Sequence, residues 1–304
     1  MKRRSSYLKF GAMALALGIV IGSCKDDDKL PAIDGYNNSD EVASDNLVAQ
    51  WTFDDNNNEN KSGTAPSNTY GTVSTTDGKI GKALKLDGGA LVYPPIDAIN
   101  TADGLANFSV SMWVNVKNTK GAGGAFTSFF GIIYEQSDFW GNIQASAETG
   151  RHLPSSDTLE LKNDLNTLLA DGKTVRGENN VAQFNADAKD AGHPNGQEGK
   201  WFLGAKDWVH YVMTWDASTH RFDIYANGVL SGGYPFRGDC PAMKMRVPAK
   251  AAFGTLAFKD VGFQGDRPDW APMAHASIDD VRVYSTALSQ AEVTALFNLG
   301  NAGR

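Results

Sequence analysis

The sequence predicts an all-β protein: an antiparallel β-sandwich with a long loop and helix insertion and a short C-terminal helix. Residues 108–116 alternate apolar and polar side chains, as a half-buried strand does. Asn227-Gly228 stands between two apolar runs, which is the strongest short signal of a β-hairpin. Near the C-terminus, an alternating run over 277–284 precedes Ser289 and Glu292, whose spacing is that of a capping box. This ending predicts one strand followed by a helix of about three turns.

The first 23 residues have the composition of a targeting signal rather than of a folded segment. Basic residues open it, and the apolar run over 11–21 is too short to cross about 30 Å of hydrocarbon as a helix. Ile21-Gly22-Ser23-Cys24 resembles a lipoprotein signal-peptidase box. This resemblance implies that Cys24 becomes the lipidated first residue of the mature chain, for example with palmitate. An ordinary secretory signal with a chance cysteine is the alternative.

The stretch 24–46 is polar and acidic without apolar periodicity, so we expect a flexible tether. Its beginning, Lys25-Asp26-Asp27-Asp28, is similar to the acidic export signal of outer-surface lipoproteins in some Gram-negative bacteria. The two resemblances together imply a cell-surface lipoprotein of the outer membrane. Its contact with the membrane would be the N-terminal lipid anchor alone.

Net charge limits the classes of possible binding partner, and the cysteine count limits the possible disulfides. The formal net charge is −7, and the four basic residues of the targeting signal leave −11 for the rest. That balance argues against nucleic acid and against an anionic bilayer surface. Besides Cys24 the chain holds only Cys240, so a disulfide framework is not possible. We interpret Cys240 as a small buried apolar side chain.

Further strands are expected along the rest of the chain. Trp51 and Phe53 share one face of a first strand, and an oxygen-rich loop over 55–60 follows. The remaining strands are expected within 79–88, 91–93, 129–134, 208–216, 221–230 and 252–258. Short strands with turns between them and a single terminal helix are typical of an antiparallel sandwich.

Five segments in this order resemble the signature strands of laminin-G-like jelly rolls: Trp51-Thr52-Phe53-Asp54, 108–114, Trp208-Val209-His210-Tyr211, Tyr225-Ala226-Asn227-Gly228 and 278–284. The chain is therefore similar to laminin-G-like domains of the concanavalin A-like lectin/glucanase superfamily. This resemblance implies one jelly-roll domain over 47–304. The departure is an insertion over about 135–200, in which we expect a helix at 157–169. A loop of that length in a compact domain is usually functional or mobile.

The sequence lacks the patterns of common catalytic sites. Sandwich hydrolases of this superfamily carry Glu-x-Asp-x-(x)-Glu on one strand, and no such run occurs here, nor does Gly-x-Ser-x-Gly, His-Glu-x-x-His or a P-loop. Asp279 and Asp280 are adjacent, so on a regular strand they would point to opposite faces. We expect His210, inside a strand, to be structural. The protein is therefore expected not to be an enzyme.

Asp54, Asp87 and Asp279 are the candidate metal ligands. The resemblance implies that the first and last strands lie side by side, and that a structural Ca²⁺ can bind at their junction with help from the loop at Asp87. Calcium takes six to eight oxygen ligands, and the loop 54–60 offers many. The alternative is a solvated acidic turn in which Asp280 pairs with Arg282 or with backbone amides.

Three tryptophans lie among loop residues, whereas Trp51, Trp113, Trp208 and Trp215 fall in strand patterns and are expected in the core. Aromatic rings stack on sugar rings, while carboxylates and guanidinium groups bind hydroxyls. The candidate ligand-binding residues are accordingly Asp138, Phe139, Trp140, Trp201, Arg267 and Trp270. The alternative is that each loop tryptophan fixes its loop to the sandwich.

Together these observations predict non-catalytic binding of an extracellular glycan, a polysaccharide, at the outer cell surface. Outer-membrane glycan import machinery is the expected protein partner. An adhesion module that binds a protein is the first alternative, and a divergent glycoside hydrolase or lyase is the second.

Overall fold

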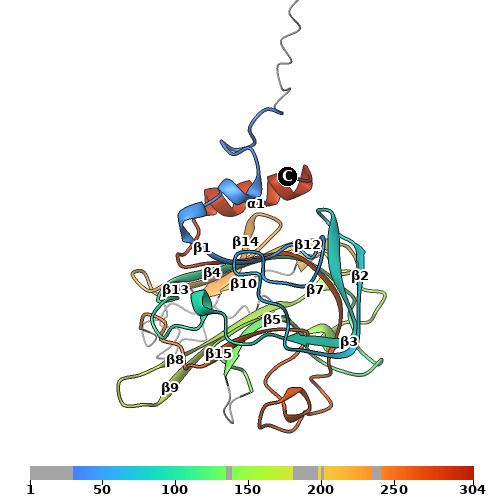
Figure 1. The fold of residues 1–304 in the computed structure, drawn as a ribbon. Helices are drawn as coiled ribbons and strands as arrows, with labels where there is room; N and C mark the ends of the chain where they lie inside the picture. Colours follow the sequence, from blue (N-terminus) through green and yellow to red (C-terminus); the bar gives the residue numbers. More distant parts are fainter. Residues whose placement is uncertain (1–29, 135–138, 181–197, 200–201, 235–240) are drawn as a thin grey trace, which may run out of the picture. The chain divides into compact units, whose positions relative to one another are not determined.

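The computed structural model describes residues 30–134, 139–180, 198–199, 202–234 and 241–304. The targeting signal and Cys24 lie outside these residues. Residues Ala32–Arg304 form one compact unit, which is almost entirely β-structure (Figure 1). Within the described parts of the chain, no helix is both long and apolar enough to cross a membrane.

The strands of the described residues are β1 (Leu47–Trp51), β2 (Asn68–Asp77), β3 (Lys82–Val92), β4 (Phe108–Val116), β5 (Thr127–Tyr134), β6 (Ile143–Ala147), β7 (Thr158–Leu159), β8 (Leu161–Leu168), β9 (Thr174–Asn180), β10 (Glu198–Gly199), β11 (Phe202–Leu203), β12 (Trp208–Asp216), β13 (Arg221–Ala226), β14 (Val229–Tyr234), β15 (Ala249–Phe253) and β16 (Ala274–Tyr284). One α-helix, α1 (Gln290–Asn301), follows the last strand. Short 3₁₀ turns occur at Ser39–Glu41, Ser44–Asn46, Asp97–Ile99, Thr149–Arg151 and Lys259–Val261.

All strands except β7 and β11 belong to one curled antiparallel sheet. One layer runs in the order β10-β14-β13-β12-β4-β16, and the other runs β15-β5-β6-β8-β9. The layers meet at β3, which pairs along most of its length with β16 and at its end with β15. β1 pairs with the end of β16, so the first and last strands are neighbours, as expected. The predicted jelly-roll sandwich is confirmed.

Alternate side chains of the strands fill the core between the layers. The apolar positions of β4 predicted from the alternation at 108–116 all face this core. At its centre, the Trp51 ring contacts Tyr93, Phe130 and Phe253 with ring centroids 5.6, 5.5 and 5.4 Å away. Aromatic contacts of this kind stabilise the sandwich beyond the area they bury.

The predicted C-terminal helix is confirmed, and its first turn has the predicted cap. The Ser289 hydroxyl accepts from the Glu292 amide at 3.3 Å, and the Glu292 carboxylate accepts from the Ser289 amide at 2.8 Å. Apolar side chains of α1, including Leu296, share a buried cluster with Val212 of β12, Tyr225 of β13 and Tyr284 of β16. Figure 1 shows α1 lying against this side of the sheet. A Cβ added at Gly300 would lie 2.6 Å from the Trp113 ring, so the helix can approach the sheet this closely only with glycine there.

The predicted hairpin is also present. β13 and β14 pair around Asn227 and Gly228, whose φ angles are 51° and 76°. Two successive positive φ values are those of a type I′ turn, which Asn-Gly adopts at little cost.

The segment 32–46, assigned to the tether from its composition, is folded instead. Val42 is fully buried and packs with residues of α1, while Ile33 and Tyr36 lie against the same group. The Ser39 hydroxyl donates to the Arg304 carbonyl at 2.6 Å, and Arg304 Nε donates to the Asn37 carbonyl at 2.8 Å. Three apolar side chains in a polar stretch thus fasten this segment to the C-terminal helix. We call residues 32–46 the clasp.

The helix predicted at 157–169 is wrong, because these residues form β7 and β8. Leu161 and Leu165 of β8 face the core, with Asn163 between them on the same face. β8 pairs with β6 on one side and β9 on the other. A strand needs this pairing, which local sequence does not display, and tertiary context overrides helix propensity.

Candidate functional site

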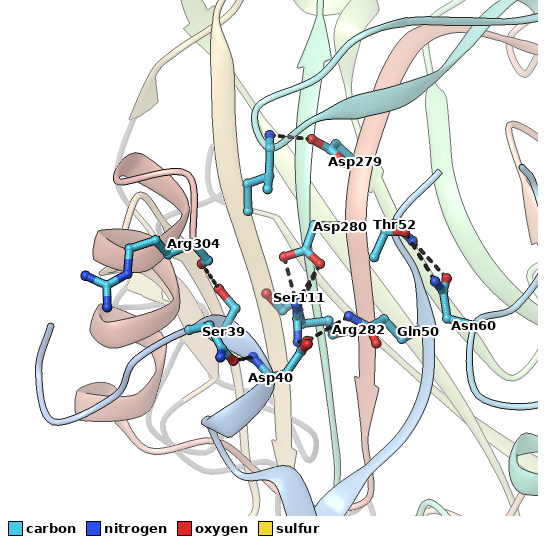
Figure 2. Close-up of polar contacts among 12 residues, drawn as sticks. Ser39, Asp40, Gln50, Thr52, Asn60, Ser111, Asp279, Asp280, Arg282 and Arg304 are labelled. Atoms are coloured by element: carbon cyan, nitrogen blue, oxygen red, sulfur yellow. Dashed lines mark hydrogen bonds and ion pairs between the residues drawn. The ribbon is translucent and has the colours of Figure 1, made fainter. Parts of the chain in front are cut away.

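Asp54, just after β1, and Asp279, in the middle of β16, line the same cavity, so they lie near each other as the resemblance implied. Asp54 Oδ1 accepts from the Lys82 amide at 2.8 Å. Asp279 Oδ2 accepts from the Ile80 amide at 2.9 Å, and Figure 2 shows the bond at Asp279. Both carboxylates thereby bind the same turn, residues 78–82. A Cβ at Gly81 would lie 2.0 Å from Asp54 Oδ1, so the turn requires glycine. The two carboxylates line a cavity of about 170 Å³, which we call the acidic corner.

The Asp279 carboxyl of the acidic corner is strongly perturbed by its surroundings. It is fully buried, and its Oδ1 has no hydrogen-bond partner among the described residues. Burial raises the pKa of Asp279 to about 7, although the Ile80 amide acts in the opposite direction. A buried carboxylate oxygen without a partner is costly, and a cation beside it would remove that cost.

Asp280 points into the same cavity, contrary to the expectation that adjacent residues face opposite sides. The register between β16 and β4 shifts after Asp279, and Asp280 has a φ of 44°, so a β-bulge turns its side chain. Arg282 Nε donates to the Asp280 carboxylate at 2.9 Å, while Arg282 Nη1 donates to Asp40 of the clasp at 2.7 Å (Figure 2). The pairing of Asp280 with Arg282, one of the two alternatives for this turn, is therefore present.

Asp87, the third predicted metal ligand, lies elsewhere. Its Oδ1 is 2.7 Å from His275 Nδ1, and the pair lines a different cavity. In the parts of the chain that the structure describes, no group of three or more His, Cys, Asp or Glu side chains could hold a metal ion. Any cation at the acidic corner would need backbone carbonyls or water to complete its oxygen ligands.

Three of the predicted glycan-binding residues come together in one aromatic cluster, made of Phe126, Phe139, Trp140, Phe258 and Trp270. The Trp140 and Trp270 rings stack with centroids 5.9 Å apart, and Phe126 contacts both edge-on at 5.6 and 5.9 Å. Phe139 stacks on Phe258 at 5.3 Å. Trp270 is 37% exposed, whereas Phe139 and Trp140 are partly buried. The cluster therefore combines loop anchoring with one accessible ring.

Arg267 borders this cluster, but its side chain is largely engaged. Its guanidinium lies over the Phe258 ring at 4.7 Å and forms an ion pair with Asp260 at 2.6 Å. It also donates to the Ala271 carbonyl at 2.8 Å and to the Thr255 hydroxyl at 2.8 Å. These bonds fix the loop that presents Trp270. Asp138 and Trp201, the two other predicted ligand residues, lie outside the described residues.

A cavity opens beside the aromatic cluster. Its volume is about 590 Å³, within the range of small-molecule sites. Phe126 forms part of its wall, together with Arg267, Asp269 and His275. Thr119 and Thr127 add hydroxyl groups. We call it the main cavity.

Sequence reasoning missed a pair of glutamates. The Glu148 amide donates to the Glu160 carbonyl at 2.9 Å, so the two residues face each other across adjacent strand ends. Glu160 is buried, with His152 Nε2 2.6 Å from one oxygen and Arg151 Nε 3.3 Å from the other; burial raises its pKa. Glu148 binds Lys162 at 3.2 Å. Each of the two glutamates is thus held in a pair with basic side chains, which is a structural role.

Comparison with known proteins identifies the family of the fold. A family model described as the concanavalin A-like lectin/glucanases superfamily matches residues 92–294. A search of curated protein sequences finds no match.

Several solved structures share this fold. The binding domain of Paraclostridial Mosquitocidal Protein 1 has a TM-score of 0.53 and 16% identity, with 84% of this chain and 52% of that chain covered. The botulinum neurotoxin serotype D/C VPI 5993 binding domain has a TM-score of 0.53 and 13% identity, with 84% of this chain and 52% of that chain covered. The botulinum neurotoxin serotype D ligand binding domain in complex with N-acetylneuraminic acid has a TM-score of 0.51 and 13% identity, with 86% of this chain and 52% of that chain covered. The chain thus spans about half the length of these structures, and at these identities the likeness shows the fold alone.

Proposed function

Because the chain belongs to the concanavalin A-like lectin/glucanase superfamily, we propose that it binds a glycan without cleaving it, in the main cavity beside the aromatic cluster. The observation that carries this proposal is the position of Trp270. Its ring is partly exposed and packs edge-on against Phe126, which forms a wall of the cavity. An exposed, rigid aromatic ring next to hydroxyl and carboxylate groups suits the apolar face and polar rim of a sugar.

The loop that carries Trp270 is held in place before any ligand binds. Arg267 fixes it through Asp260, Thr255 and Ala271, and Trp140 stacks beneath the ring of Trp270. A site that is already ordered loses less conformational entropy on binding. This rigidity supports a role in recognition. One solved structure with this fold holds N-acetylneuraminic acid, which also supports a sugar ligand.

Non-catalytic action is part of the proposal. Glycoside hydrolysis needs two carboxyl groups that both reach the substrate. Glu148 and Glu160 are adjacent, but Glu160 is 1% exposed and bound by His152 and Arg151. At this exposure the Glu160 carboxyl does not reach a sugar at the surface. Reducing-end release from any polysaccharide that the protein retains would favour the alternative, a glycoside hydrolase or lyase.

We further propose that the protein is a lipoprotein of the outer cell surface, anchored through Cys24 and acting beside glycan import machinery. The basic and apolar targeting signal and its resemblance to a lipoprotein box support this. Because the clasp folds onto the domain, only residues 24–31 are left for the proposed tether. Labelled palmitate that enters the wild-type protein but not Cys24→Ser would support the anchor, and equal labelling of both would exclude it.

A structural Ca²⁺ at the acidic corner is the third part of the proposal. Asp54 and Asp279 would supply carboxylate oxygens there, while Asp87 stays with His275. The buried, unpartnered Asp279 Oδ1 fits a cation ligand. When bound, the ion would hold the turn 78–82 against the middle of β16.

Native affinity electrophoresis in gels containing a panel of polysaccharides tests the main proposal. The wild-type protein should be retarded by at least one polymer, and Trp270→Ala should lose most of that retardation. Val229→Ala is the matched control, because Val229 is 62% exposed and lies on β14 in the other layer. Lack of retardation by every polymer, with capture of a protein partner instead, would favour the adhesion alternative. Unchanged retardation of Trp270→Ala would move the site away from the main cavity.

A further inference from the structure

A second cavity continues the main cavity across the outer face of β3, β16 and β4. Its volume is about 320 Å³, and it shares Thr119 and His275 with the main cavity. The two cavities therefore form one path along the surface. We call the second one the lysine groove, after Lys85 and Lys117 in its lining.

Strand register builds the floor of the lysine groove. Lys85 of β3 is opposite Ser277 of β16, which is opposite Asn115 of β4. Asp87 and His275 form the next pair along the strands. These side chains share one face because Leu84 and Leu86 of β3 face the core. The groove thus has a regular array of polar side chains.

The charge of the groove is set by the two lysines. Lys85 and Lys117 are exposed, and neither side chain has a hydrogen bond or ion pair among the described residues. Asp87, the one acid in the lining, lies on β3 two residues from Lys85, and its Oδ1 is 2.7 Å from His275 Nδ1, so two lysines stand against one acid. Lys85 and Lys117 lie two strands apart and are offset by two residues along the strand direction. Together these separations place their Cα atoms roughly 12 Å apart. In a chain of net charge −7 this is a local excess of available cations.

We propose that the lysine groove binds the acidic groups of a polysaccharide, so that the glycan of the proposed function is an anionic one. This inference rests on that proposed function. Lys85 and Lys117 pair with carboxylate or sulfate groups on separate sugar residues, while Ser277 and Asn115 bind hydroxyls. The chain of sugars continues past His275 into the main cavity.

Two matched pairs of polymers test this proposal with the full-length protein: polygalacturonate against neutral galactan, and dextran sulfate against dextran. We expect stronger retardation by the acidic member of at least one pair, and the pair that responds identifies carboxylate or sulfate. The double variant Lys85→Gln/Lys117→Gln should lose about tenfold in affinity for the acidic polymer, as two exposed ion pairs predict. Added salt should weaken wild-type binding in the same way.

Two controls separate charge from structure. Lys85→Arg/Lys117→Arg keeps both charges and should retain acidic-polymer binding. Lys244→Gln removes an exposed lysine that does not line the groove and should bind as wild type. Equal binding of neutral and acidic polymers, or wild-type affinity in the double glutamine variant, overturns the acidic-glycan proposal and leaves the proposed function intact. Absence of binding to every polysaccharide instead defeats the proposed function itself.

Discussion

Trp140 and Trp270 stack at 5.9 Å with their planes inclined by 28°, although they lie on loops far apart in the sequence. Their surroundings differ. Both rings contact Phe126 and Phe139, but Trp140 is partly buried and Lys162 Nζ lies 4.8 Å from its ring. Trp270 presents more than a third of its surface to solvent. Trp140 therefore packs inside the aromatic cluster, and Trp270 forms its solvent-exposed part.

This difference in burial predicts that alanine substitution of the two tryptophans affects stability to different extents. Trp140→Ala should lower the free energy of unfolding by about 3 kcal/mol, because it removes a packed ring beneath the loop. Trp270→Ala should cost about 1 kcal/mol or less and act mainly on glycan retention. Urea denaturation of both variants measures the first quantity. Equal destabilisation by the two substitutions would show that Trp270 is as structural as Trp140.

The acidic corner predicts a response to calcium. If Ca²⁺ binds the folded state alone, a concentration one hundred times the dissociation constant stabilises it by about 2.7 kcal/mol, which raises Tm by roughly 5–10 °C. Asp279→Asn should abolish this response, while Asp87→Asn should keep it because Asp87 lies in another cavity. Thermal unfolding with added Ca²⁺ and with excess chelator measures the effect. An identical Tm in both conditions would exclude the ion.

His210 predicts a loss of stability in acid. Its Nε2 is 2.9 Å from the Ser111 hydroxyl, and burial, helped by the charge of Arg282, lowers the pKa of His210 to about 3. The unfolded chain has its ordinary value near 6.5. Between these values the unfolded state binds the proton and the native state does not, so stability falls as pH falls from 6.5 towards 3 and is unaffected above 6.5.

The size of that effect can be isolated by substitution. From pH 7.5 to 4.5 the histidine should cost the wild type about 2–3 kcal/mol. His210→Gln should lack this part of the acid sensitivity while retaining that of all carboxyl groups. Urea denaturation at the two pH values gives the difference. Parallel pH profiles for the two proteins would mean that His210 does not titrate differently on folding.

The clasp predicts that residues before β1 contribute to stability. Val42 is fully buried against the helix-bearing side of the sheet, so Val42→Ala should cost about 2 kcal/mol through the cavity it leaves. The same change at exposed Val229 should cost well under 1 kcal/mol. Denaturation midpoints of both variants test this. Similar midpoints would return residues 32–46 to the role of a tether.

Local patterns explain why most of the fold could be predicted. Alternation at 108–116, the Asn-Gly turn and the capping box at Ser289 each act over a few residues, and each is present in the structure as predicted. The pairing of first and last strands was reached through family resemblance. The segment 32–46 was missed because its few apolar residues, such as Val42, have no regular spacing.

The candidate site was only partly predictable, because its geometry depends on register across strands. The glutamates Glu148 and Glu160 are neighbours only because β6 and β8 pair as they do. The lysine groove likewise depends on the alignment of β3, β16 and β4. No spacing along the chain reveals either arrangement.

The sequence by itself determined the strand at 108–116, the Asn227-Gly228 turn and the terminal helix, since backbone preferences and side-chain alternation are local properties. The tertiary structure decided which side chains meet. The predicted helix at 157–169 is replaced by strands, because Leu161 and Leu165 pair with residues of β6. A β-bulge places the Asp280 side chain on the same side as that of Asp279. Contacts between distant strands carry free energy that no local segment contains, and for that reason the cavities and their charges appear only in the folded chain.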